Sequence, residues 1–313
     1  MESFCTKAHH VARFRNWAAC TVGAPVTGRG SLDESGHSID PSSSMKTTFS
    51  TSGTDILING KKVYADIPET NPSAHGLLFN ARFIQGVFDD RVDPARFARF
   101  GFDEWDPDAQ TDRLIAALPE WYTQGLRAFT VGIQGGGPCF TIDSATIDNN
   151  PFGPDGRAFD PAYMDRLDRL LRAADDIGMI VIVSYFYGAQ AARLTDGQAV
   201  RNAIIRASRF LKEGGYTNVI VEVANEHDIG PFIEYHPIIA EPESMAMLID
   251  LARDESGGLP VGCSGRGGSV YREIAEASDI VLIHGNGQTR GQFYNLIKRA
   301  KSYAPGKPVV CNE

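Results

Sequence analysis

The 313-residue sequence lacks any run of 18 consecutive apolar residues, which excludes an ordinary transmembrane helix. It has no dense stretch of lysine and arginine and its net charge is −9, so its electrostatics do not favour nucleic-acid binding. The N-terminus has no continuous apolar core of the kind found in signal peptides. These absences predict a cytoplasmic protein with neither a membrane nor a nucleic acid as partner; it could be secreted if the natural N-terminus differs.

Clustered metal-binding or disulfide-forming residues are also missing. The five cysteines are widely spaced, odd in number and without a Cys-x-x-Cys pair, so neither a disulfide framework nor a zinc site is indicated. Cys263 and Cys311 fall in apolar segments and are expected to be small buried side chains. The seven histidines form no His-x-His pair, which argues against a metal-dependent barrel hydrolase. We therefore expect no metal and no cofactor.

The composition is that of an ordinary soluble protein, with 42% hydrophobic and 22% charged residues, and the length suits one large α/β domain or two smaller ones. Residues 1–44 differ from the rest because they show no sustained periodicity and end in a polar run. Such a segment cannot bury enough apolar area to order itself. We expect it to be a disordered leader or a wrongly assigned start, with the folded domain spanning residues 45–313.

An alternation of apolar runs and helical patterns begins after residue 55. A hairpin is predicted at 55–64, where Asn59-Gly60 suits a two-residue turn. The clearest helical pattern is 160–178, with Asp160 as N-cap, Pro161 in the first turn and Gly178 at its end. Strands are predicted at 82–88, 128–133, 179–185, 219–224, 260–264, 280–284 and 308–311. Further helices are predicted at 109–124, 196–212, 243–254, 270–277 and 290–303.

This alternation predicts an α/β fold with a parallel sheet. A doubly wound open sheet would be expected to carry a glycine-rich phosphate loop after its first strand, and residues 85–90 do not form one. We therefore favour a (β/α)8 TIM barrel, with the hairpin covering its lower end. Only about seven strands are present, so the eighth strand and its helix are expected to be missing from a domain truncated at its C-terminus.

Two of the predicted strands end in the same dipeptide. Asn225-Glu226 follows the fourth strand and Asn312-Glu313 follows the seventh. Barrels place catalytic groups at the carboxyl ends of their strands, and a pair of carboxylates is typical of glycoside hydrolysis. A single Asn-Glu is more often a solvated loop residue or a helix cap, but two at corresponding positions favour a catalytic pair. A separation of ~5 Å would predict retention of anomeric configuration.

The chain resembles glycoside hydrolase clan A, the cellulase-like (β/α)8 barrels, over about residues 55–313. Besides the two Asn-Glu pairs, the supporting phrases are 58–61, 159–163 and 173–179. The resemblance implies that Glu226 is the acid/base, that Glu313 is the nucleophile and that Asn225 hydrogen-bonds the sugar 2-hydroxyl. It also places His284, at the end of the sixth strand, near the subsite.

The chain departs from the clan pattern in two places. Typical cellulases have an arginine after strand two and a histidine after strand three, where this chain has residues 134–136 and 185–188. We therefore expect a divergent member rather than a cellulase.

Four further residues are weaker candidates for substrate binding. Tyr187 could offer a ring to the apolar face of a pyranose. Gln134, Asp89 and Asp90 lie just after predicted strands, where they could bind sugar hydroxyls, although the two aspartates could equally cap a loop. The sequence thus predicts a retaining hydrolase of β-linked oligo- or polysaccharides, with a noncatalytic or inactive carbohydrate-binding barrel as the alternative. The substrate sugar, its linkage and the oligomeric state are left open.

Overall fold

The computed structural model describes residues 44–100, 105–135 and 143–313, which belong to one compact unit. Residues 1–43 of the expected leader lie outside the described residues, and so do Cys5, Cys20 and Cys139. None of the helices in the described ranges has the length and apolar character needed to cross a membrane.

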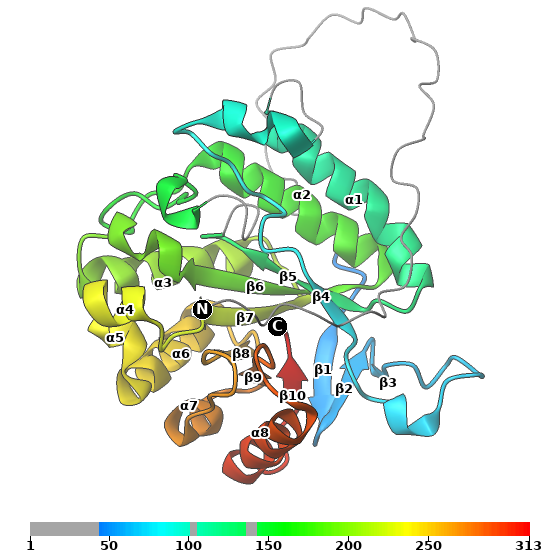
Figure 1. Ribbon diagram of the computed structural model, residues 1–313. Coiled ribbons are helices and arrows are strands. Elements are labelled where there is room, and N and C mark those ends of the chain that lie inside the picture. Colours follow the sequence, from blue (N-terminus) through cyan, green and yellow to red (C-terminus); the bar gives the residue numbers. More distant parts are fainter. Residues whose placement is uncertain (1–43, 101–104, 136–142) are drawn as a thin grey trace, which may run out of the picture. The chain divides into compact units, whose positions relative to one another are not determined.

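The strands and helices follow one another in the predicted alternation (Figure 1). The strands are β1 (Phe49–Ser52), β2 (Asp55–Ile58), β3 (Lys61–Lys62), β4 (Asn80–Arg82), β5 (Ala128–Gly132), β6 (Ile180–Tyr187), β7 (Val219–Asn225), β8 (Val261–Gly262), β9 (Val281–Ile283) and β10 (Val309–Cys311). The α-helices are α1 (Pro107–Thr123), α2 (Pro161–Ile177), α3 (Gly197–Glu213), α4 (Gly230–Tyr235), α5 (Pro237–Ala240), α6 (Pro242–Glu255), α7 (Arg272–Ala277) and α8 (Arg290–Tyr303). Short 3-10 helices occupy Pro72–Ala74, Pro94–Phe100, Ser144–Thr146 and Gly188–Arg193.

The main sheet consists of five parallel strands in the order β4-β5-β6-β7-β8. β9 and β10 form a second parallel pair, and the amide of Asp279 just before β9 donates to Val261 O of β8 at 2.8 Å. The strands therefore run side by side in chain order, with no reversal of the kind that defines a doubly wound sheet. This confirms the α/β class and the parallel sheet, although β4 and β10 share no strand pairing in the described part of the chain.

Local signals explain the best-defined helix. Asp160 Oδ1 accepts hydrogen bonds from the amides of Ala162 and Tyr163 at the start of α2, and Pro161 occupies the first turn. At the other end Gly178 adopts φ 86°, a left-handed conformation that costs glycine little. Both predicted ends of this helix are confirmed.

The first predicted strand needs correction. Residues 82–88 were expected to be extended, but β4 ends at Arg82 and the chain then turns, with Gly86 N donating to Phe83 O at 2.8 Å. Ile84 and Val87 are buried in that turn, each at most 6% exposed, while Phe83 is partly buried. Apolar periodicity alone cannot distinguish a buried turn from a strand. The sequence prediction also missed β1, α4 and α5.

The predicted hairpin closes one end of the strands. Asn59 and Gly60 have φ values of 53° and 74°, as a two-residue turn between β2 and β3 requires. Ile56 of the hairpin belongs to a buried cluster with residues from the central strands, including Ile180 and Ile220. The hairpin thus supplies apolar cover for the inner faces of those strands.

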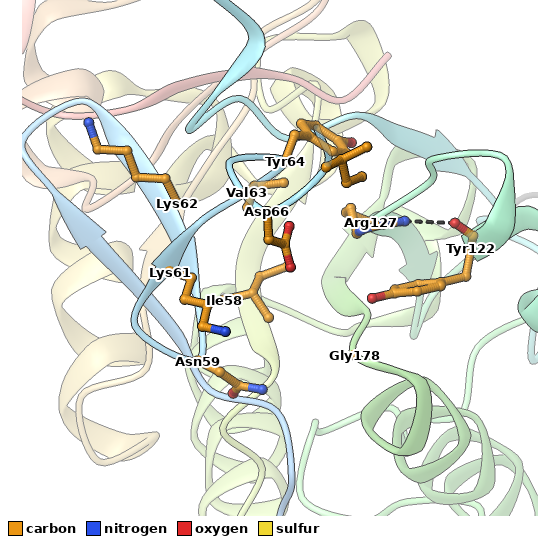
Figure 2. A pocket seen from close by; sticks show the side chains of 11 residues that line it. Ile58, Asn59, Lys61, Lys62, Val63, Tyr64, Asp66, Tyr122, Arg127 and Gly178 are labelled. Carbon is orange, nitrogen blue, oxygen red and sulfur yellow. Dashed lines mark hydrogen bonds between the residues drawn. The ribbon is translucent and has the colours of Figure 1, made fainter. Parts of the chain in front are cut away.

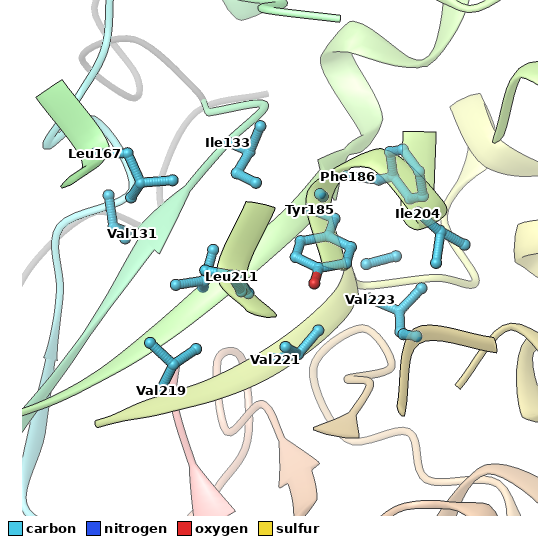
Figure 3. Packing of buried hydrophobic residues seen from close by; sticks show 14 of the residues in the cluster. Val131, Ile133, Leu167, Tyr185, Phe186, Ile204, Leu211, Val219, Val221 and Val223 are labelled. Atoms are coloured by element: carbon cyan, nitrogen blue, oxygen red, sulfur yellow. The ribbon is translucent and has the colours of Figure 1, made fainter. Parts of the chain in front are cut away.

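The side chains of β7 point alternately toward the surrounding helices and toward the inner side of the strands. Val219, Val221 and Val223 belong to the large cluster that the strands form with the surrounding helices, among them Leu167 of α2 and Leu211 of α3 (Figure 3). The intervening residues, Ile220 and Glu222, point to the opposite side, since neighbouring side chains on a strand alternate. Ile220 joins the inner cluster, which leaves Glu222 as a carboxylate on the inner face.

Truncating a side chain in the large cluster between the strands and the surrounding helices should destabilise the protein strongly. Leu170 of α2 is fully buried, so Leu170→Ala should lower the free energy of unfolding by about 2–5 kcal/mol through lost burial and a residual cavity. Leu77→Ala is the matched control because Leu77 is 57% exposed, and it should change stability by less than about 0.5 kcal/mol. Urea unfolding followed by circular dichroism measures both. Equal losses would contradict the assignment of Leu170 to the core.

Candidate active site

The two glutamates predicted from the strand ends meet in the structure. Glu226 directly follows β7, and Glu313 lies two residues beyond β10. One carboxylate oxygen of Glu226, one of Glu313 and a ring nitrogen of His284 all lie within 4.8 Å of one another. Parallel strands bring their carboxyl ends to the same edge of a sheet, and this is why residues so distant in sequence come together.

The backbone at Glu226 is in an unusual conformation. Its φ is +55°, in the left-handed region, which costs a residue with a side chain on the order of 1 kcal/mol. The Glu226 amide donates to Ser264 Oγ at 3.1 Å, and its carbonyl oxygen accepts from Ile229 N at 3.2 Å. These bonds stabilise the turn that ends β7 at the residue whose side chain contacts His284.

Two side chains bridge the carboxylates. His284 is fully buried, and its Nδ1 lies 3.0 Å from Glu226 Oε1 and 3.4 Å from Glu313 Oε2. Asn286 Nδ2 lies 3.2 Å from Glu313 Oε1 and 3.5 Å from Glu226 Oε1. An ionised carboxylate can only accept hydrogen bonds, so the contact with Glu226 requires a proton on His284 Nδ1. The structure thus places His284 beside the pair, and its role near the subsite stays a prediction.

Arg82 supplies a positive charge to the site. Its Nη2 lies 3.0 Å from Glu313 Oε2 and also donates to Asn225 Oδ1 at 2.6 Å. The sequence prediction missed this residue because it placed Arg82 at the beginning of a strand, at the wrong end of the sheet. The signal available in the sequence was an arginine three residues after the apolar run 77–79.

Burial would raise the pKa of the Glu226 carboxyl, but other effects outweigh it. The hydrogen bond from His284, the charge on His284, the hydrogen bond from Asn286 and the charge on Arg82 together hold this pKa below its ordinary value. In the free protein the site therefore favours the ionised form of Glu226. A proton donor at this position needs a change in its surroundings when substrate binds.

The weaker candidates are engaged in loop contacts. Gln134 is buried, donates to Asn150 Oδ1 at 2.9 Å and accepts from the amide of Tyr187 at 3.2 Å. Asp90 is buried and pairs with Arg96 at 2.8 Å. Asp89 accepts from Trp105 Nε1 at 3.0 Å and from the Asp90 amide at 2.8 Å. Tyr187 is partly buried. These contacts organise the loops, and the substrate-binding roles of the four residues stay predictions.

Glu226, His284 and Glu313 could together offer three ligand atoms to a metal ion. The guanidinium of Arg82 lies against Glu313 and already compensates part of the negative charge that would attract a cation. The chemistry of this cluster therefore resembles an acid–base pair more than a metal site.

A separate pocket of about 270 Å³ lies at the other ends of the strands (Figure 2). Its lining includes Arg127 and Gly178, which come just before β5 and β6. Arg127 Nη1 donates to Tyr122 O at 2.7 Å, and its guanidinium lies 3.8 Å from the centre of the Tyr122 ring. This arginine therefore already has its partners within the fold.

The fold is similar to those of solved glycoside hydrolases. A candidate glycoside hydrolase from Bacteroides vulgatus matches with a TM-score of 0.51 and 13% identity, over 87% of this chain and 48% of its own. A glycoside hydrolase of family 5 from the same organism matches with a TM-score of 0.50 and 14% identity, over 82% of this chain and 54% of its own. No protein-family model and no curated protein matches the sequence.

The chain spans about half the length of these two structures. At this identity the similarity establishes the fold, and it confirms the resemblance to cellulase-like glycosidase barrels at that level.

The lowered pKa of Glu226 predicts a specific dependence of stability on acid. Folding lowers this pKa from 4.5, so the ionised side chain stabilises the fold above that pH and this contribution is lost as pH falls through the lowered value. Glu226→Gln removes the titration. The difference in unfolding free energy between wild type and variant should therefore shift in favour of the variant below pH 4.5. Urea unfolding across that range tests this, and a constant difference would contradict the pKa direction.

Proposed function

We propose that the protein is a retaining glycoside hydrolase that cleaves β-linked oligo- or polysaccharides. The observation that carries this proposal is the separation of the carboxylates, with one oxygen of Glu226 and one of Glu313 within 4.8 Å. Retaining enzymes hold their carboxyl groups about 5–5.5 Å apart, whereas inverting enzymes need about 6.5–9.5 Å to admit a water molecule. The fold similarity to glycoside hydrolases and the sequential order of β4 to β10 support a domain of the (β/α)8-barrel type.

Glu313 is the proposed nucleophile. Its ion pair with Arg82 and its hydrogen bond from Asn286 orient the carboxylate that would attack the anomeric carbon. The bond from this carbon to the leaving oxygen breaks while a bond to a Glu313 oxygen forms, and Glu226 gives its proton to the leaving oxygen. Glu226 then takes a proton from water, which attacks the same carbon and releases Glu313.

Glu226 can carry the required proton only when its contacts change. Substrate in the site would exclude water and compete with His284 for Glu226, and both effects raise the pKa of this carboxyl. Asn225 is the proposed partner of the sugar 2-hydroxyl. Arg82 holds its side-chain oxygen, and the Asn225 amide nitrogen makes no hydrogen bond within the described ranges, so it can donate to a sugar.

The alternative is a barrel that binds carbohydrate without cleaving it. The lowered pKa of Glu226 favours this alternative, because an ionised Glu226 offers no proton to a leaving group. Binding of an oligosaccharide without any release of product over days would support it.

Exchanging either glutamate should remove hydrolysis of aryl β-glycosides. Glu226→Gln should lower kcat about 10²–10⁴-fold for poor leaving groups, the usual contribution of a general acid, and less for dinitrophenyl leaving groups. Glu313→Ala should lower activity with all leaving groups, and azide should restore it by forming the glycosyl azide of inverted configuration.

Glu243→Gln is the matched control, because Glu243 is an exposed residue of α6 and its exchange should leave kcat unchanged. Full activity of Glu226→Gln or Glu313→Ala would overturn the assignment of that residue.

The stereochemistry of the first product tests the mechanism independently. Because the carboxylates are too close for a water molecule to attack from between them, hydrolysis of a β-glycoside should first release the β-anomer. Proton NMR during the first minutes distinguishes the two anomers. Initial release of the α-anomer would show that the enzyme inverts.

A further inference from the structure

A third glutamate lies deeper in the interior than the carboxylate pair, and the proposed reaction does not use it. Glu222 is on β7, four residues before Glu226, and is completely buried. Burying a carboxylate is costly unless other groups hydrogen-bond to it. Glu222 Oε1 accepts from Ser264 Oγ at 2.7 Å and from Asn312 Nδ2 at 3.1 Å, while Oε2 has no hydrogen-bond partner in the described ranges.

One of these bonds leads to Glu226. Ser264 has a single hydroxyl proton, and the 2.7 Å contact to Glu222 is much shorter than its 3.5 Å contact to Ala224 O. With the proton directed at Glu222, a lone pair of Ser264 Oγ accepts from the amide of Glu226 at 3.1 Å. Glu222 therefore orients the hydroxyl that stabilises the left-handed backbone of Glu226.

The other bond leads to Glu313. Asn312 immediately precedes Glu313, is 2% exposed, and donates its side-chain amide to Glu222. Its backbone amide donates to Ile283 O of β9 at 3.2 Å. The side-chain bond is a direct connection between β7 and the residue beside the proposed nucleophile.

His284 lies between the two connections. Its Nδ1 faces Glu226 and Glu313, while Nε2 lies 3.9 Å from Glu222 Oε1. The charged groups nearest the ring are the three glutamates, and Arg82 pairs with the Glu313 oxygen that His284 approaches.

We propose that Glu222 is a positioning residue that sets the separation of Glu226 and Glu313, acting through Ser264 on one and through Asn312 on the other. This inference rests on the proposed function. Stability alone explains Glu222 poorly, because burying a polar side chain that is not fully hydrogen-bonded costs free energy that an apolar residue would not cost. A single acceptor atom that bonds the supports of both carboxylates explains why a carboxyl group is placed there.

Ser264→Ala tests the connection to Glu226, with Ser208→Ala as the matched control. Both serines are buried, and Ser208 lies in α3, where it bonds the Tyr185 hydroxyl away from the site. Both variants should lose similar stability, but only Ser264→Ala should lower kcat on an aryl β-glycoside, by about 10²-fold with KM little changed, because misplacing a catalytic group by about 1 Å has that effect.

Two exchanges of Glu222 separate hydrogen bonding from apolar packing. Glu222→Gln keeps an oxygen that can accept from Ser264 and Asn312, so it should retain kcat within about tenfold. Glu222→Leu has no acceptor and should lower kcat about 10²-fold or more. If Glu222→Leu does not fold, the comparison of Ser264→Ala with Ser208→Ala is the test. Equal kcat values for Ser264→Ala and Ser208→Ala would overturn the proposal.

A titration distinguishes this proposal from the proposed function, since it needs no turnover. Loss of the Ser264 hydroxyl should loosen the contact between Glu226 and His284, so the pKa of Glu226 should rise in Ser264→Ala and stay unchanged in Ser208→Ala. Carbon-13 NMR of labelled glutamate, assigned with Glu226→Gln, measures it. An unchanged Glu226 titration in Ser264→Ala refutes positioning even if hydrolysis is confirmed, whereas a raised value supports positioning even if no glycoside is cleaved.

Discussion

Two carboxylates held within 4.8 Å of each other repel, and the structure around them is arranged to compensate that repulsion. Arg82 pairs with Glu313, His284 donates to Glu226, and Asn286 reaches both. Each compensating group and the glutamate that it contacts lie at the ends of different strands. The pair can therefore exist only when several parallel strands end at the same edge.

The surroundings of the two glutamates differ, and the difference matches their proposed roles. Glu313 faces a permanent positive charge on Arg82, which suits a nucleophile that must stay ionised. Glu226 is held mainly by its hydrogen bond from His284. The two carboxylates thus have different partners, a guanidinium for Glu313 and an imidazole for Glu226, as expected of a pair with separate roles.

The interior of the strands is divided into an apolar and a polar part. Ile220 and its neighbours form a dry cluster that the N-terminal hairpin covers, while Glu222, two residues further along the same face, belongs to a buried hydrogen-bonded group. A buried polar group of this kind is specific because each member needs its partner in one position. A hydrogen-bonded group directly beside the residues that hold the two carboxylates can fix their positions more rigidly than apolar packing could.

Much of the fold was predictable, because helix ends and parallel strands leave local signals in the chain. Asp160 and Gly178 mark the two ends of α2, and Asn59-Gly60 marks the hairpin. The first strand was misplaced, since the buried turn after Arg82 has the same apolar composition as a strand. The short helices α4 and α5 were missed because six and four residues are too few to show a helical period.

The sequence by itself determined the order of strands and helices and the two Asn-Glu dipeptides at strand ends, because both are local patterns. Only the tertiary structure decided that Arg82 faces Glu313 and that Glu222 bonds the supports of both carboxylates. These contacts join residues from opposite parts of the chain. Their existence depends on strand register and on which face of each strand points inward, and a shift of one residue would turn every one of these side chains away.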